Sequence, residues 1–194
     1  GDHKLVNMKY FFTRKLMFVK ECDAVVCYPG GFGTMDEAME VLTLVQTGKR
    51  DVVPIILADA PGGTYWKMLD EFIRKELLAG GMISPEDLHL YSVTDDFEAA
   101  ADEIMQFYKN YHSMRYVGRD LVLRLREPLP QESLDIVNRD FADVLNSGQF
   151  VQTDKLEEEE DDENTNGLTR LVAHFNRRNH GRLRQLINFI NTQM

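Results

Sequence analysis

Residues 23–45 constrain the fold of this chain more than any other stretch. An apolar run of strand length occupies residues 24–28, and Pro29-Gly30-Gly31 then interrupts both helix and strand. Beyond the glycines, apolar residues recur at helical spacing, at Ala38, Val41, Leu42 and Val45. The pattern predicts a buried strand, a glycine turn and the first turns of an amphipathic helix.

The start of that helix is the first candidate for a binding site. Thr34 stands where an N-cap is expected, with Glu37 three residues later as in a capping box. Glycines let the backbone approach a ligand closely, and the unpaired amides of a helix N-terminus favour an anion such as a phosphate. A plain strand–turn–helix corner with a cap accounts for the same residues. The loop is not a Walker loop, and Asp36 stands where a dinucleotide fingerprint has its third glycine.

A family resemblance favours the binding site over the plain corner. The segment from Pro29 to Glu37 resembles the PGGxGTxxE signature of the LOG (LONELY GUY) family, whose members are often labelled lysine decarboxylases. The family also carries an Arg-Lys pair on the helix before the signature strand, and Arg14-Lys15 match it. The resemblance covers roughly residues 3–108. It implies hydrolysis of nucleoside 5′-monophosphates to the free base and ribose 5-phosphate.

The resemblance implies that Arg14 and Glu37 are the catalytic residues. Hydrolysis of an N-glycosidic bond passes through an oxocarbenium-like state, which a carboxylate such as Glu37 would stabilise. A guanidinium stays charged, so Arg14 would grip phosphate or ribose oxygens; an ordinary surface arginine is the alternative. Asp36 is expected to face elsewhere as a surface residue. Further substrate- and phosphate-binding positions are expected at Lys15, Gly30, Gly31, Gly33, Thr34 and Glu40.

The remaining pattern of the first half indicates an α/β domain. Strands and helices alternate, which predicts a Rossmann-like parallel sheet flanked by helices, with ligands bound at the carboxyl ends of the strands. The loop at residues 59–64 is expected at that same edge, and Gly80-Gly81 ends the helix that follows it. The expected elements are helices at residues 8–21, 65–78 and 96–108 and strands at residues 52–58 and 88–93.

The resemblance begins in the middle of the family pattern. A LOG-type domain normally opens with strand–helix units that precede the signature, so the N-terminal part of the domain is expected to be missing here. A three-stranded remnant would expose an unpaired sheet edge, which natural proteins avoid. We therefore expect a partner segment or chain to cover that edge, and we expect a homodimer or higher homo-oligomer.

Residues 111–194 are expected to form a small appended α+β subdomain, after a nucleotide-binding domain at residues 1–110. Residues 120–126 alternate apolar and charged side chains, which predicts a half-exposed strand. Seven consecutive acidic residues at 157–163 predict a solvated, disordered loop over residues 154–167. The other expected elements are helices at residues 133–145 and 182–190, a strand at residues 168–175 and a short strand beginning at residues 150–151.

Composition excludes several classes of protein. The net charge of −10 argues against general nucleic-acid binding, although the five arginines after Glu163 give the last 31 residues +5 and leave −15 for the rest. No apolar run is long enough to span a bilayer, and no membrane association is expected. Cys22 and Cys27 are expected to be unpaired structural residues of a cytoplasmic protein. The five histidines are scattered without ligand spacing, and we expect no metal site. No cofactor is expected either.

A second class of function is compatible with the same signature. Some relatives with this signature are carriers of the molybdenum cofactor, so a nucleotide- or cofactor-binding protein could use the same cradle without hydrolysis. The presence of both Arg14 and Glu37 favours the enzyme. Lysine decarboxylation is the least favoured activity, because it requires pyridoxal phosphate on a Schiff-base lysine and no local pattern supports one.

Overall fold

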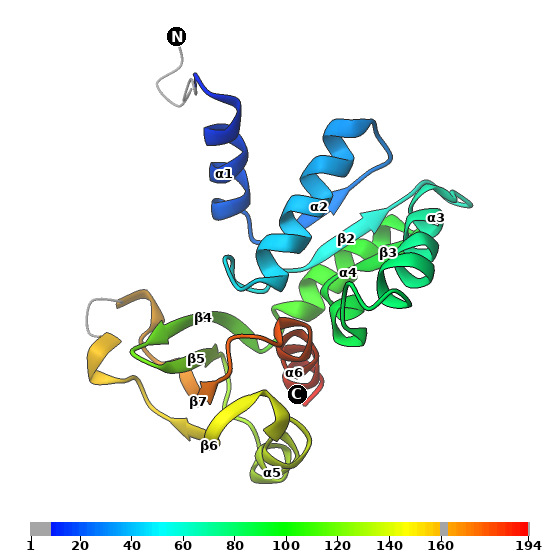
Figure 1. Cartoon of the computed structure of the whole chain (residues 1–194). Coiled ribbons are helices and arrows are strands. Elements are labelled where there is room, and N and C mark those ends of the chain that lie inside the picture. The colour runs from blue at the N-terminus through cyan, green and yellow to red at the C-terminus, as the bar shows by residue number, and fades with distance from the viewer. Residues whose placement is uncertain (1–8, 160–162, 194) are drawn as a thin grey trace.

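The computed structural model describes residues 9–159 and 163–193 of the 194-residue chain (Figure 1). Within them, a three-stranded parallel sheet has the order β1-β2-β3 and a four-stranded antiparallel sheet the order β4-β5-β7-β6. The C-terminal helix α6 (His180–Thr192) lies between the two units in Figure 1. This arrangement confirms the expected α/β class with an additional α+β element.

The parallel sheet is short, and its central strand is completely buried. It consists of β1 (Val25–Cys27), β2 (Ile55–Ala58) and β3 (Ser92–Thr94), with Val25 opposite Ile55 and Ile56 opposite Ser92. All four residues of β2 are buried, because strands of a parallel sheet are covered on both faces. Among the described residues, β1 lies at one edge of this sheet and β3 at the other.

Four helices flank these strands close to the expected positions. They are α1 (Phe11–Glu21), α2 (Phe32–Gln46), α3 (Tyr65–Phe72), which continues as a π-helix (Ile73–Leu78), and α4 (Phe97–Phe107). The strand expected at residues 88–93 is shorter and begins later, at β3. A 3₁₀ helix at Pro85–Leu90 takes its place, held at its start by the Asp87 carboxylate, which accepts the Ser84 amide at 2.9 Å.

Helix α2 begins three residues earlier than the capping-box pattern predicts. Gly31 is the N-cap, and its carbonyl accepts the amides of Thr34 and Met35 at 3.1 and 3.2 Å. The expected N-cap role of Thr34 and its capping box with Glu37 are therefore wrong: both residues lie inside the helix. The reason is that glycine itself is an acceptable N-cap, so the helix starts at the turn.

The antiparallel unit is more deeply buried than expected. It contains β4 (Tyr111–Val117), β5 (Asp120–Leu125), β6 (Leu145–Thr153) and β7 (Thr169–Phe175), with α5 (Gln131–Asp140) beside them. The sequence pattern missed β4. Strand β5 was expected to be half-exposed, but its residues from Leu121 to Leu125 are all buried. Leu121, Leu123 and Leu125 belong to the hydrophobic core, and Arg124 pairs with the buried Glu159.

The expectation of a solvated acidic loop is wrong at Glu159. This side chain is fully buried and pairs with Arg124 at 2.6 Å and with Arg170 at 2.8 Å. Arg124 and Arg170 face each other across β5 and β7, so one carboxylate offsets the charge of two neighbouring arginines. Residues 160–162 of the acidic run lie outside the described residues.

Helix α6 joins the two units. His180, in its first turn, contacts the Gln46 carbonyl at the end of α2 at 3.1 Å, and Arg184 pairs with Glu103 of α4 at 2.9 Å. The buried Asn191 side chain accepts the amide of Tyr111 at 2.8 Å, at the start of β4. Apolar side chains of both units consequently form one continuous core. The boundary at residue 110 stays a prediction.

Candidate functional site

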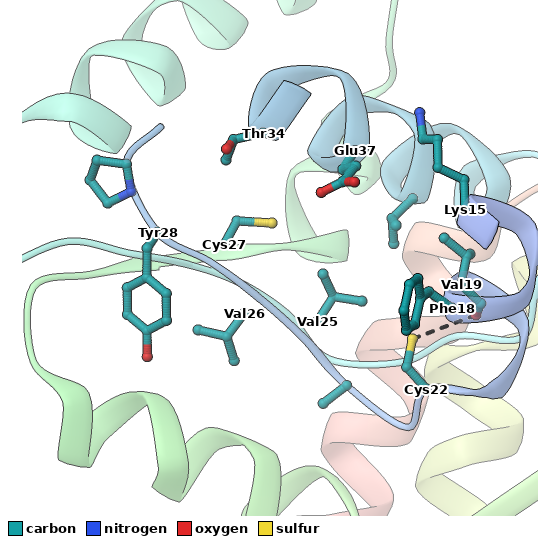
Figure 2. A pocket seen from close by; sticks show the side chains of 13 residues that line it. Lys15, Phe18, Val19, Cys22, Val25, Val26, Cys27, Tyr28, Thr34 and Glu37 are labelled. Carbon is teal, nitrogen blue, oxygen red and sulfur yellow. Dashed lines mark hydrogen bonds between the residues drawn. The ribbon is translucent and has the colours of Figure 1, made fainter. Parts of the chain in front are cut away.

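A cavity of about 610 Å³ lies along the edge strand β1, between α1 and the N-terminal half of α2 (Figure 2). Its walls are largely apolar and hold one lysine and one glutamate. The lining residues are Lys15, Phe18, Val19, Cys22, Ala24, Val25, Val26, Cys27, Tyr28, Pro29, Thr34, Glu37 and Val41. Three of the expected site residues, Lys15, Thr34 and Glu37, are therefore brought to one cavity.

The glycines of the signature loop differ in the space around them. A β-carbon on Gly30 would collide with the Thr34 hydroxyl, so Gly30 allows the loop to pack against the first turn of α2. A β-carbon on Gly31 or Gly33 would meet no atom within 4 Å. These two positions are exposed and leave the helix N-terminus open, as a site for an anion requires.

Glu37 provides the acidic group of the cavity. Figure 2 shows its side chain extending from α2 into the space above β1, near Cys27. Burial, and the negative charge of Glu37, raise the pKa of the Cys27 thiol. Cys22 also lines the cavity, and both cysteines are free, as expected; their structural role stays a prediction. A raised pKa keeps Cys27 in the unreactive thiol form.

Lys15 connects α1 to α2 through two carboxylates. Its ammonium lies 2.6 Å from Asp36 and 2.8 Å from Glu40. The hydrogen bonds to Asp36 and Glu40 raise the pKa of Lys15 and keep it charged. Asp36 was expected to face away from the site; although its side chain is 61% exposed, it contacts Lys15 and contributes to the attachment of α1.

Arg14 lies outside the cavity wall. It is an exposed residue of α1 and is not among the described residues that line the cavity. Glu40, which was expected near the substrate, is directed to Lys15. Glu37, Thr34 and Lys15 thus share the wall of one cavity, and Arg14 is not among its lining residues. The catalytic and binding roles of these residues remain predictions.

A second loop supports the signature loop. The sequence placed this loop at the same edge of the sheet but did not single out Asp59 or Tyr65 as residues of the site. Asp59 follows β2 and is only 6% exposed; its carboxylate accepts the amides of Ala60 and Tyr65, each at 2.9 Å. The Tyr65 hydroxyl then donates to the Gly30 carbonyl at 2.8 Å. The signal in the sequence is an aspartate at a strand end followed by glycines and the start of a helix, a pattern typical of a side-chain-supported turn.

Comparison with known proteins decides the family. The family model described as possible lysine decarboxylase matches residues 2–104, which is more than half of the chain. The chain belongs to this family, the LOG family. The match contains the signature loop, Glu37 and the Arg14-Lys15 pair, so it includes the cavity just described.

Several relatives of this LOG family member carry names that describe an enzymatic activity. A cytokinin riboside 5′-monophosphate phosphoribohydrolase of Arabidopsis thaliana is 39% identical over 77 residues, which is 40% of this chain and 34% of the relative. A probable one of Oryza sativa subsp. japonica is 31% identical over 94 residues, 48% of this chain and 40% of the relative. The matched stretches thus cover well under half of these relatives' length.

Two further properties of the described residues bear on the site. None of the helices in residues 9–159 and 163–193 is long and apolar enough to cross a membrane. In the same part of the chain, no three histidine, cysteine or acidic side chains lie close enough together to hold a metal ion.

Proposed function

We propose that this chain forms the phosphate- and ribose-binding part of an enzyme that hydrolyses the N-glycosidic bond of a nucleoside 5′-monophosphate. The products would be the free base and ribose 5-phosphate. The observation that carries the proposal is the position of the Glu37 carboxylate in the same cavity as the open N-terminus of α2. The relatives are named as cytokinin riboside 5′-monophosphate phosphoribohydrolases, and these names support the same reaction.

The phosphate would bind at the N-terminus of α2. The first amides of a helix have no carbonyl one turn earlier to bond, and the helix dipole adds positive character there. Gly31 and Gly33 leave space for a ligand to approach those amides, and the Thr34 hydroxyl lies beside them on the cavity wall. Lys15 adds a positive charge to the same cavity.

The ribose would then lie beside Glu37. In the reaction, a water oxygen bonds to the anomeric carbon while the carbon–nitrogen bond breaks and its electron pair leaves with the base. The Glu37 carboxylate would stabilise the positive charge that develops on the sugar and accept a proton from the attacking water. The departing base gains a proton, so the overall change is the addition of one water molecule.

Arg14 would act from α1, next to Lys15. A guanidinium remains charged at all relevant pH values and can hold two phosphate or ribose oxygens at once. Because Arg14 is exposed and is not a lining residue, its contact with a nucleotide requires the ligand to extend beyond the residues that line the cavity. We propose cytoplasmic homo-oligomers as the working form of the protein, on the basis of the family resemblance.

The position of Arg14 also supports the alternative function, a binding protein or carrier without hydrolase activity. A nucleotide- or molybdenum-cofactor-binding carrier would need the cradle of α2 but no second catalytic group. Lysine decarboxylation gains nothing from the cavity, since the two carboxylates that hold Lys15 keep it protonated. A Schiff base requires a neutral amine.

Turnover measurements on the full-length protein decide between the enzyme and the carrier. A panel of nucleoside 5′-monophosphates is incubated with the parent protein and with Glu37→Gln and Arg14→Ala, and free base and ribose 5-phosphate are quantified. We expect release by the parent and a loss of at least a hundredfold in Glu37→Gln. Glu98→Gln is the matched control, because Glu98 is an exposed residue in the first turn of α4 and lies outside the cavity wall. Nucleotide binding without turnover would refute the hydrolase and favour the carrier.

A further inference from the structure

One side chain at the start of α3, directly after the loop that follows β2, holds the backbone of the loop after β1. Tyr65 is the first residue of α3, and its hydroxyl donates to the Gly30 carbonyl at 2.8 Å. The two residues are 35 positions apart in the chain and follow different strands. The bond therefore fixes the signature loop from outside its own strand–turn–helix unit.

Tyr65 is itself held firmly. Its amide donates to the buried Asp59 carboxylate at 2.9 Å, and the next residue, Trp66, is fully buried with its indole N–H donating to the Ala58 carbonyl at 3.1 Å. A β-carbon on Gly63 would collide with the Asp59 carboxylate, so glycine lets the loop close over this anchor. The Tyr65 backbone thus has a fixed position relative to the end of β2.

The Tyr65 hydroxyl determines the orientation of the Gly30–Gly31 peptide. In a planar trans peptide the carbonyl and the following N–H point in opposite directions. Holding the Gly30 carbonyl toward Tyr65 therefore points the Gly31 N–H away from it. A peptide between two glycines has wide conformational freedom, so without an external contact its plane can rotate. Gly31 is the N-cap of α2, where ligand-binding amides are expected.

We propose that Tyr65 is a positioning residue for phosphate binding. Its hydroxyl preorganises the Gly30–Gly31 peptide so that the amides at the start of α2 meet the phosphate of a nucleoside 5′-monophosphate without rearrangement. The phosphate part of this inference rests on the proposed function. Tyr65 acts through the loop and need not touch the reacting atoms. The competing explanation is that its hydroxyl only contributes to the stability of the fold.

The test uses Tyr65→Phe, which keeps the ring and removes the hydroxyl. Tyr91→Phe is the matched control, because the Tyr91 hydroxyl also makes one hydrogen bond, to Asp70 at 2.6 Å, and Tyr91 is not a residue of the cavity wall. The probe is ribose 5-phosphate, which is common to all nucleoside monophosphates whatever the base. We expect its dissociation constant to rise about three- to tenfold in Tyr65→Phe and to stay unchanged in Tyr91→Phe.

Amide hydrogen exchange without ligand provides a readout independent of any activity. We expect faster exchange in peptides covering residues 28–34 of Tyr65→Phe, with the rest of the protein and its melting temperature little changed. Unchanged exchange in those residues, or faster exchange throughout the protein, would overturn the positioning role. If the parent protein neither binds ribose 5-phosphate nor hydrolyses nucleotides, the proposed function fails, while the exchange result still decides whether Tyr65 fixes the loop.

Discussion

Glu159 and Arg170 form a completely buried ion pair, with 2.8 Å between the Glu159 Oε2 and the Arg170 Nε. The second carboxylate oxygen of Glu159 accepts Arg124 at 2.6 Å. Arg170 also donates to the Thr165 carbonyl at 2.9 Å, so the network holds both described flanks of the acidic segment against the antiparallel sheet. A run of acidic residues that looks uniformly solvated thus contains one residue of the interior.

Removing the Glu159 charge should be strongly destabilising. Glu159→Gln leaves two buried arginines without a counter-charge, and we expect a loss of about 3 kcal/mol in the free energy of unfolding. Urea denaturation at neutral pH measures it. Glu158→Gln is the control, because Glu158 is the exposed neighbour and should change stability by less than about 0.5 kcal/mol. Equal effects of the two substitutions would show that the buried network contributes little.

The lowered pKa of Glu159 should make the stability of the protein sensitive to acid. Burial acts to raise the pKa of Glu159, but the hydrogen bonds from Arg170 and Arg124 outweigh it and lower the pKa. A lowered carboxyl pKa contributes stability above the ordinary glutamate pKa of about 4.3, and this contribution is lost as the pH falls through the folded value. The difference in unfolding free energy between the parent and Glu159→Gln should therefore shrink below about pH 4. If the difference in unfolding free energy between the two proteins did not change with pH, the prediction would be wrong.

Gly33→Ala should increase stability and abolish ligand binding. Gly33 lies in the first turn of α2 with open space around it, so alanine should stabilise the helix by up to about 1 kcal/mol. The added methyl group would occupy the approach to the helix amides. Thermal melting and ribose 5-phosphate titration measure the two effects. If a correctly folded Gly33→Ala protein bound ribose 5-phosphate as well as the parent does, the N-terminus of α2 would not be the phosphate site.

Gly181→Ala should have the opposite effect on stability. A β-carbon at this position of α6 would collide with the Glu86 backbone carbonyl, which cannot move as easily as a side chain. We expect a loss of about 1–3 kcal/mol, in spite of the higher helix propensity of alanine. The comparison with Gly33→Ala in the same denaturation experiment separates propensity from packing, and a stabilised Gly181→Ala protein would show that α6 does not pack closely on this segment.

His180 should make stability depend on pH near neutrality. Burial lowers the pKa of His180, although its contact with the Gln46 carbonyl acts in the other direction. Because the charged form is disfavoured in the folded state, stability should fall as the pH drops below the unfolded value of about 6.5. The decline should be weaker in His180→Asn than in His89→Asn, since His89 is exposed. Chemical denaturation between about pH 5.5 and 7.5, on either side of the unfolded histidine pKa of about 6.5, measures this change in stability.

Local patterns were sufficient where neighbouring residues determine the structure. The Pro-Gly-Gly turn and the apolar spacing after it predicted a strand followed by a helix, and β1 and α2 are there. Asp96 was expected to open a helix, and its side chain caps α4 by accepting the Glu98 amide at 2.8 Å. The predicted start of α2 was wrong because two acceptable N-caps, Gly31 and Thr34, lie only three residues apart.

The sequence by itself determined the family, the order of strands and helices in the first half, and the loop most suited to a phosphate, because these depend on turns, caps and spacing along the chain. Only the tertiary structure decided what those residues contact. It buried Glu159, paired Lys15 with Asp36 and Glu40, left Arg14 outside the cavity and brought Tyr65 to Gly30. Such contacts join segments that are distant in the chain, and their energies arise from burial and charge pairing that no local pattern records.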